Sequence, residues 1–255
     1  PAAYEETCKE HFLIVDPEVR KQMILEGLQK LADEKGGTII MDDDLLEEVV
    51  YLVEYPTALC GEFDEDYLKL PEAAIITPMK DHQRYFPMRD KDGKLMNLFL
   101  TVRNGNDYHL ETVQHGNERV LRARLDDAKF FFEEDKKHKL ADYTEKLKKI
   151  VFQDGLGTLY DKAQRLEKIT VFLNHKLDLG LDDAKLQRAS LLAKADLATQ
   201  MVMEFTELQG VMGKEYALID GEDAGVAEAI NEQYQPRFAG DVLPQTDMGK
   251  VLGIA

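Results

Sequence analysis

The sequence predicts an α+β protein, with a mixed α/β part at residues 1–114 followed by an all-helical part at residues 115–255. Helix and strand signals alternate in the first part, whereas from about residue 110 apolar residues recur at helical spacing almost throughout. A chain of 255 residues can bury a sizeable core in one or two domains. Its 44% hydrophobic and 32% charged residues are typical of a folded, helix-rich protein.

Two helices are predicted first. Asp16 is a capping residue followed by Pro17 at the first helical position, and Gly36 is expected to stop this helix. Asp42 is expected near the start of the second helix. That helix should end before Pro56, because the residue before proline avoids the helical region.

A strand at residues 57–63 comes next, then a short helix opened by Pro71 and kinked or ended by Pro78. Residues 84–89 lead into an acidic turn that contains Gly93, and residues 94–102 return as a strand with Leu95, Leu98, Leu100 and Val102. This pattern predicts a β-hairpin.

The second part carries one helical pattern after another, and we find no internal repeat or low-complexity linker. Asp182 or Asp183 is a credible cap for one helix, and Glu222 after Gly221 begins another. The expected helices lie near residues 117–135, 138–151, 158–177, 183–204, 207–218 and 222–234.

The segment at residues 117–132 is the most informative of these helices. Arg119, Arg122 and Lys129 fall on one face of it, where they are candidates for RNA contact. The other face is an apolar stripe of Val120, Leu121, Leu125, Ala128, Phe131 and Phe132.

Arg124 falls within that apolar stripe, where an unpaired charge is costly. One interpretation is a buried ion pair that holds helices together, with Asp161 or Asp196 as its partner; the other is an RNA contact. In the first case, Arg124→Ala should lower stability by about 3 kcal/mol, because it leaves a buried carboxylate unpaired.

Residues 82–84 form a second candidate contact site. His82, Gln83 and Arg84 can hydrogen-bond to bases or phosphates, and Tyr85 can stack on a base. Alternatively, this segment is the start of a strand with Tyr85 or Phe86 in the core. The lysines of residues 136–149 likewise have two interpretations, a basic surface or a solvated helix face with intrahelical ion pairs.

The net charge, the lengths of the apolar runs and the number of cysteines argue against several classes of protein. A formal net charge of −17 argues against a general nucleic-acid binder but not against a local basic face. There is no apolar run of membrane-spanning length and no visible signal peptide, so a cytoplasmic protein is expected. The two distant cysteines, Cys8 and Cys60, suit that reducing setting.

Motifs for phosphate cradles, nucleophile elbows and zinc sites are missing. None of the six histidines is followed by aspartate. A helical phosphohydrolase of the HD type needs that dipeptide as adjacent metal ligands, so this class is disfavoured. We expect no bound metal and no catalytic residue in this chain.

Several segments, taken together, resemble one family closely. Residues 79–86 resemble M-x-x-H-Q-x-Y-F, and residues 116–131 resemble G-N-E-R-V-L-x-x-R-L-x-D-A-x-F-F. Residues 194–202 and 204–213 resemble K-x-D-L-x-T-x-M-V and E-F-T-x-x-Q-G-x-M-G. These are motifs of the bacterial glycyl-tRNA synthetase β subunit, and the matches run in order from about residue 47 to the end.

The resemblance implies a central fragment of that subunit, without the N-terminal region and the anticodon-binding domain, and inactive alone. It implies that the subunit binds tRNA(Gly), while the α subunit holds ATP and glycine, in an assembly of two α and two β subunits. It also implies an HD-like helical domain with a degenerate metal motif, in which only Asp196 remains of the His-Asp pair. A helical adaptor without an RNA role stays open as an alternative.

Overall fold

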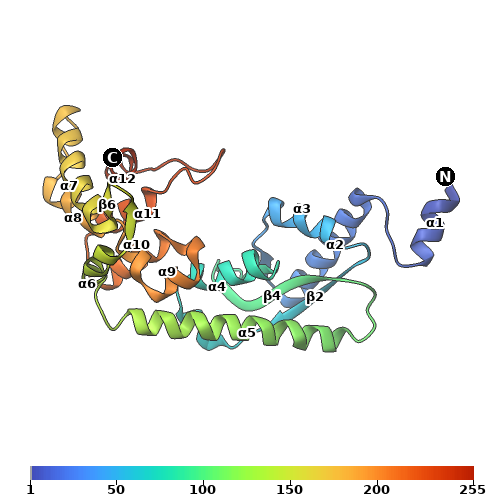
Figure 1. The fold of residues 1–255 in the computed structure, drawn as a ribbon. Helices are drawn as coiled ribbons and strands as arrows, with labels where there is room; N and C mark the ends of the chain where they lie inside the picture. Colours follow the sequence, from blue (N-terminus) through green and yellow to red (C-terminus); the bar gives the residue numbers. More distant parts are fainter. Residues whose placement is uncertain (1) are drawn as a thin grey trace. The chain divides into compact units, whose positions relative to one another are not determined.

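The computed structural model describes residues 2–255 and divides into two compact units, one up to Lys129 and the other from Phe130 to Ala255. Helix α5, Leu110–Asp135, runs through this division (Figure 1). The α+β class predicted from the sequence is confirmed, because a small antiparallel sheet accompanies a mainly helical chain. The domain boundary predicted between residues 114 and 115 stays a prediction.

The first unit contains a four-stranded antiparallel sheet in the order β1-β3-β4-β2. Strands β2 and β4 pair over their whole shared length, from Pro56 opposite Asn104 to Glu62 opposite Leu98. The predicted strand and hairpin are therefore confirmed. The strands are β1 Thr38–Ile39, β2 Pro56–Glu62, β3 Phe86–Arg89 and β4 Leu95–Asn104.

The helices of this unit begin where their caps predict. The side chain of Asp16 accepts from the backbone N–H of Glu18, and Gly36 ends the helix in the left-handed region. Asp42 caps the next helix by accepting from the N–H of Leu45. The helices are α1 Ala2–Glu10, α2 Pro17–Lys35, α3 Asp43–Leu52 and α4 Glu72–Thr77, with a 3-10 turn at Glu65–Lys69 and a π-helical turn at Pro78–His82.

Helices α2 and α3 cover one face of the sheet. Ile24 and Leu28 of α2 and Val49 of α3 form one buried cluster with Phe86 and Leu100 of the strands. Each of these side chains is less than 5% exposed, so the cluster is the core of the unit.

The second unit is helical apart from one small hairpin, β5 Val151–Gln153 with β6 Gly157–Thr158. Helices α7 and α8 pack side by side, and α11 packs against α8, α10 and α12 (Figure 1). The helices are α6 Leu140–Tyr143, α7 Leu159–Lys176, α8 Asp183–Leu192, α9 Gln200–Glu204, α10 Val211–Ile219, α11 Ala224–Glu232 and α12 Asp247–Ile254.

Three predicted helices of this part are corrected. The helix expected near residues 138–151 is α6 followed by a 3-10 turn at Thr144–Lys149. The helix expected at 183–204 is broken after Leu192, and α9 starts anew at Gln200. The helix near 207–218 starts only at Val211, after a 3-10 turn. Within residues 2–255, no helix combines the length and apolar character needed to cross a bilayer.

Candidate nucleic-acid interface

Helix α5 presents the predicted cationic face. Arg119, Arg122 and Lys129 are all exposed, and neither arginine forms an ion pair with the described residues of its unit. Lys129 Nζ lies 5.7 Å from the ring centroid of Tyr67. Both guanidinium groups are therefore free of a direct ion pair within the described part of their unit and can donate to a phosphate.

The apolar stripe of this helix is narrower than predicted. Leu121, Leu125, Ala128 and Phe132 are buried, whereas Val120 is 44% exposed. Spacings of four, three and four residues keep the buried set on one side. Val120 precedes that set by one position, which turns it about 100° away.

Arg122 also borders a groove lined by carboxylates. Glu62, Asp64, Glu65 and Glu118 are among its lining residues. Glu118 accepts a hydrogen bond from the backbone N–H of Glu62 at 3.1 Å, which ties α5 to the edge of β2. The acidic groove weakens anion binding at Arg122 relative to Arg119, because like charges repel the phosphate.

Arg124 is half-buried rather than buried. It forms no ion pair with the described residues of its own unit. Asp161 and Asp196 belong to the other unit, so the pairing predicted from the sequence stays a prediction. Asp161 accepts from the Thr158 N–H at 2.7 Å and completes the N-terminal cap of α7.

The candidate contact residues at positions 82–84 are partly exposed, whereas the neighbouring Tyr85 lies in the core. Arg84 donates to Glu48 Oε1 at 2.7 Å and has a left-handed backbone, with φ of 60°. His82 and Gln83 are half-buried. Tyr85 is 4% exposed and stacks on Phe99 with ring centroids 4.5 Å apart. The suggestion that Tyr85 stacks on a base is therefore wrong; its ring belongs to the core.

Asp196 is fully buried, as the sequence predicted. Its Oδ2 accepts from the backbone N–H of Gly210 at 2.6 Å, and burial raises its pKa to about 6. Lys194 Nζ lies 4.0 Å from the ring centroid of Tyr234. Burial, together with the charge of Lys162, lowers the pKa of Lys194 to about 8. Both residues lie in the segment that the family resemblance assigns to a degenerate metal motif, and that assignment stays a prediction. Within residues 2–255, no three His, Cys, Asp or Glu side chains gather as a metal site.

The sequence reasoning missed Asp135, the last residue of α5. Its carboxylate is 1% exposed and accepts from the backbone N–H groups of Gln200 and Met201, each at 2.9 Å. It also accepts from the hydroxyls of Tyr143 at 3.2 Å and Tyr216 at 3.0 Å. The lysines of residues 136–149 pair with exposed or half-buried glutamates instead, as Glu133–Lys136, Glu134–Lys137 and Glu145–Lys148.

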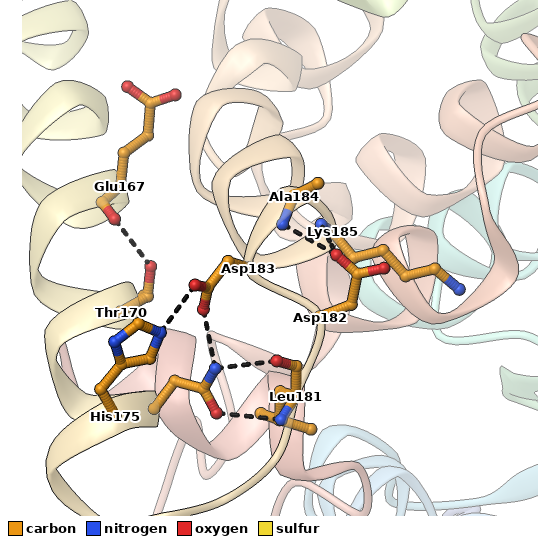
Figure 2. A network of polar contacts seen from close by, with 9 residues as sticks. Glu167, Thr170, His175, Leu181, Asp182, Asp183, Ala184 and Lys185 are labelled. Atoms are coloured by element: carbon orange, nitrogen blue, oxygen red, sulfur yellow. Dashed lines mark hydrogen bonds and ion pairs between the residues drawn. The ribbon is translucent and has the colours of Figure 1, made fainter.

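A polar network closes the loop between α7 and α8 (Figure 2). Asn174 Nδ2 donates to the carbonyl of Leu181 and to Asp183 Oδ1, each at 2.8 Å, and its Oδ1 accepts from the Leu181 N–H. His175 Nε2 lies 2.7 Å from Asp183 Oδ2. The hydrogen bonds from Asn174 and then His175 lower the pKa of Asp183. These side chains bond to each other and the loop backbone, so they are structural.

The β5–β6 hairpin was also missed. Val151, Phe152 and Leu156 are 72%, 39% and 53% exposed. Lys162 lies over the Phe152 ring at 4.3 Å, and Lys148 over the Tyr160 ring at 4.6 Å. The available signal in the sequence is a turn of two glycines and an acidic residue at positions 154–157, which is also compatible with a plain turn between helices.

Comparisons with known proteins show the class of enzyme component and the family to which this chain is similar. A model described as "Glycyl-tRNA synthetase beta subunit", a component of an aminoacyl-tRNA synthetase, matches residues 1–255. The chain belongs to the glycyl-tRNA synthetase β subunit family. The resemblance seen in the sequence motifs is thereby confirmed.

Relatives named glycine–tRNA ligase beta subunit are about half identical to the chain. The protein of Clostridioides difficile is 54% identical over 252 residues, that of Desulforamulus reducens 52% over 256 and that of Bacillus subtilis 50% over 256. The alignments cover 99% to 100% of this chain but only 36% to 38% of these relatives. The chain therefore spans little more than a third of their length.

Proposed function

We propose that the chain is a non-catalytic, tRNA-binding and scaffolding segment of the enzyme that attaches glycine to tRNA(Gly) using ATP. In this proposal the α subunit holds ATP and glycine, and the chain acts in the cytoplasm as part of an assembly of two α and two β subunits. The segment alone is inactive. The names of the relatives, which cover the chain from end to end, support the enzyme class.

The exposed cationic face of α5 carries the RNA-binding part of the proposal. In a chain with a formal net charge of −17, an exposed arginine without an ion pair is unusual, because carboxylates are abundant. Arg119 and Arg122 lie one helical turn apart, at a spacing that places both guanidinium groups on one side. Such a pair can contact neighbouring phosphates of an RNA backbone.

The scaffolding part is supported by the roles of the buried carboxylates. Asp135 accepts from the first backbone N–H groups of α9, Asp196 from Gly210, and Glu232 from the N–H of Gln245 at 2.7 Å. Each of these three acids is at most 3% exposed. They stabilise helix ends and loops, so their charge serves the fold of the helical unit.

Salt-dependent binding of tRNA to a full-length β subunit with this sequence tests the proposal. Replacing Arg119, Arg122 and Lys129 by alanine should make the plot of log affinity against log salt shallower by about 2, since each lost phosphate contact removes roughly 0.7 to 0.9. The matched control replaces three exposed lysines elsewhere in the first unit, Lys30, Lys91 and Lys94.

Two results would contradict the proposal. If the full-length subunit, with or without its α partner, fails to bind tRNA at low salt, the helical adaptor without an RNA role is the better account. If both triple variants weaken binding equally, the cationic face of α5 is not a specific contact, and only the general charge of the surface matters.

A further inference from the structure

The β5–β6 hairpin leaves apolar side chains uncovered in a way that its own unit does not explain. A two-stranded hairpin is marginally stable by itself in water. Here its base is held by the N–H of Leu159, which donates to the carbonyl of Ile150 at 2.9 Å. Arg165 donates to the carbonyl of Leu156 at 2.9 Å. These two hydrogen bonds tie the hairpin to the start of α7, while Val151, Phe152 and Leu156 stay exposed.

The charge around this hairpin is opposite in sign to that of the whole chain. Between residues 146 and 165 there are five cationic side chains and only two carboxylates. One of the two, Asp161, is committed to the cap of α7. Lys148 is paired with the exposed Glu145, but Lys149 and Lys162 form no ion pair with the described residues of their unit. The surface therefore attracts anions.

Two lysines at this place also repel each other. The charge of Lys162 contributes to the lowered pKa of Lys194, so the two ammonium groups are close enough to interact. Phe152 lies under Lys162 and Tyr234 under Lys194, and the charge of Asp196 offsets only part of the lowering of the Lys194 pKa. A bound phosphate would offset the repulsion between the two ammonium groups, one of which, that of Lys162, lies over the face of the Phe152 ring.

We propose that the β5–β6 hairpin binds unpaired nucleotides of RNA, with Lys149 and Lys162 on the phosphates and Phe152 against a base. The inference rests on the proposed function, because it assigns a second contact to the same RNA partner. Exposed aromatic side chains beside a cationic track are the usual means of holding single-stranded nucleic acid. Unpaired bases are required, since a base within a duplex offers no free face.

A charge-reversal variant of the full-length β subunit tests this surface. Lys148→Glu, Lys149→Glu and Lys162→Glu together should weaken tRNA binding at least about tenfold at low salt and make the salt slope shallower by about 2. The control reverses Lys176 at the far end of α7, Lys185 of α8 and Lys250 of α12, all in the same unit, and so has the same net charge. It should change affinity less than about twofold.

A second variant changes a single exposed side chain, so a loss of binding cannot be attributed to loss of the fold. Phe152→Ala removes a 39% exposed ring and should weaken binding of a short single-stranded oligoribonucleotide about fivefold or more, while a duplex of equal length is unaffected. Circular dichroism verifies that each variant is folded.

Three outcomes overturn the inference. If the wild-type subunit binds tRNA and the hairpin variants bind equally well, the hairpin is not an RNA contact, although the proposed function stands. If the wild-type subunit binds no tRNA, the proposed function fails and the inference fails with it. If the variants keep tRNA binding but no longer co-purify with the α subunit, the hairpin is a protein-docking surface instead.

Discussion

Asp135 accepts a hydrogen bond from the backbone N–H of Met201 at 2.9 Å, across 66 positions of sequence. This contact ties the end of the long helix α5 to the beginning of the short helix α9. The carboxylate also accepts from Gln200 at the same distance, so it pairs with two of the four backbone N–H groups that a helix start leaves without a partner. The break between α8 and α9 is therefore stabilised from outside the segment.

Replacement of Asp135 by alanine should lower the stability of the helical unit by about 3 kcal/mol, because four donors in a buried site lose their acceptor. Hydrogen exchange of the Gln200 and Met201 amides, followed with thermal unfolding, measures the effect. Glu133→Ala is the control, since that 59% exposed side chain pairs only with Lys136. Equal losses in the two variants would contradict the capping role.

Asp196 makes the stability of this unit depend on pH. Burial raises its pKa from 3.8 to about 6, so the folded protein binds this proton more tightly than the unfolded chain does. The contribution is therefore fully present below pH 3.8 and lost as the pH rises through about 6. Asp196→Asn keeps an acceptor for Gly210 but cannot titrate.

The wild type should consequently gain about 1.4 kcal/mol relative to Asp196→Asn between pH 7 and pH 5. Urea unfolding of both proteins across this pH range measures the difference in stability. The contributions of the other carboxylates cancel in this difference, because both proteins contain them. A difference that does not change with pH would show that Asp196 stays ionised in the folded state.

Glu232 should prove essential for the position of α12. It is 3% exposed and accepts from the N–H of Gln245 at 2.7 Å and from the hydroxyl of Thr246, the cap of that helix. Glu232→Ala should cost about 2 kcal/mol and expose residues 236–246 to proteolysis, because the cap loses its anchor. Glu228→Ala on the same helix removes a half-buried ion pair with Lys214 and leaves the cap of α12 intact, so it should leave cleavage unchanged.

In the first unit, Gly61 permits the ring of Phe99 to lie directly on β2. A Cβ at this position would collide with that ring, which is buried and stacked on Tyr85. Gly61→Ala should therefore lower the melting temperature, with a loss of about 2 kcal/mol from overpacking. Gly116→Ala, in open space within α5, should instead stabilise the helix by about 0.5 kcal/mol. A gain in both variants would contradict the packing argument.

The sequence by itself determined the elements whose signals are local. Asp16 with Pro17, Gly36 and Asp42 begin or end helices through their own side chains and backbone freedom. The β3–β4 hairpin followed from the turn signal at residues 90–93 and the apolar residues of the strand after it. The family motifs likewise lie in single stretches, so the resemblance needed no structure.

Only the tertiary structure decided what depends on distant partners. The break before Gln200 carries no proline or glycine, and Asp135 supplies its acceptor from 65 positions away. Tyr85 could stack on a base or in the core, and Phe99 on the opposite strand settled that choice. The tertiary structure likewise placed the exposed β5–β6 hairpin beside Lys149 and Lys162. Burial and pairing are properties of the folded surroundings, whereas a pattern along the chain specifies only what a residue and its near neighbours can do.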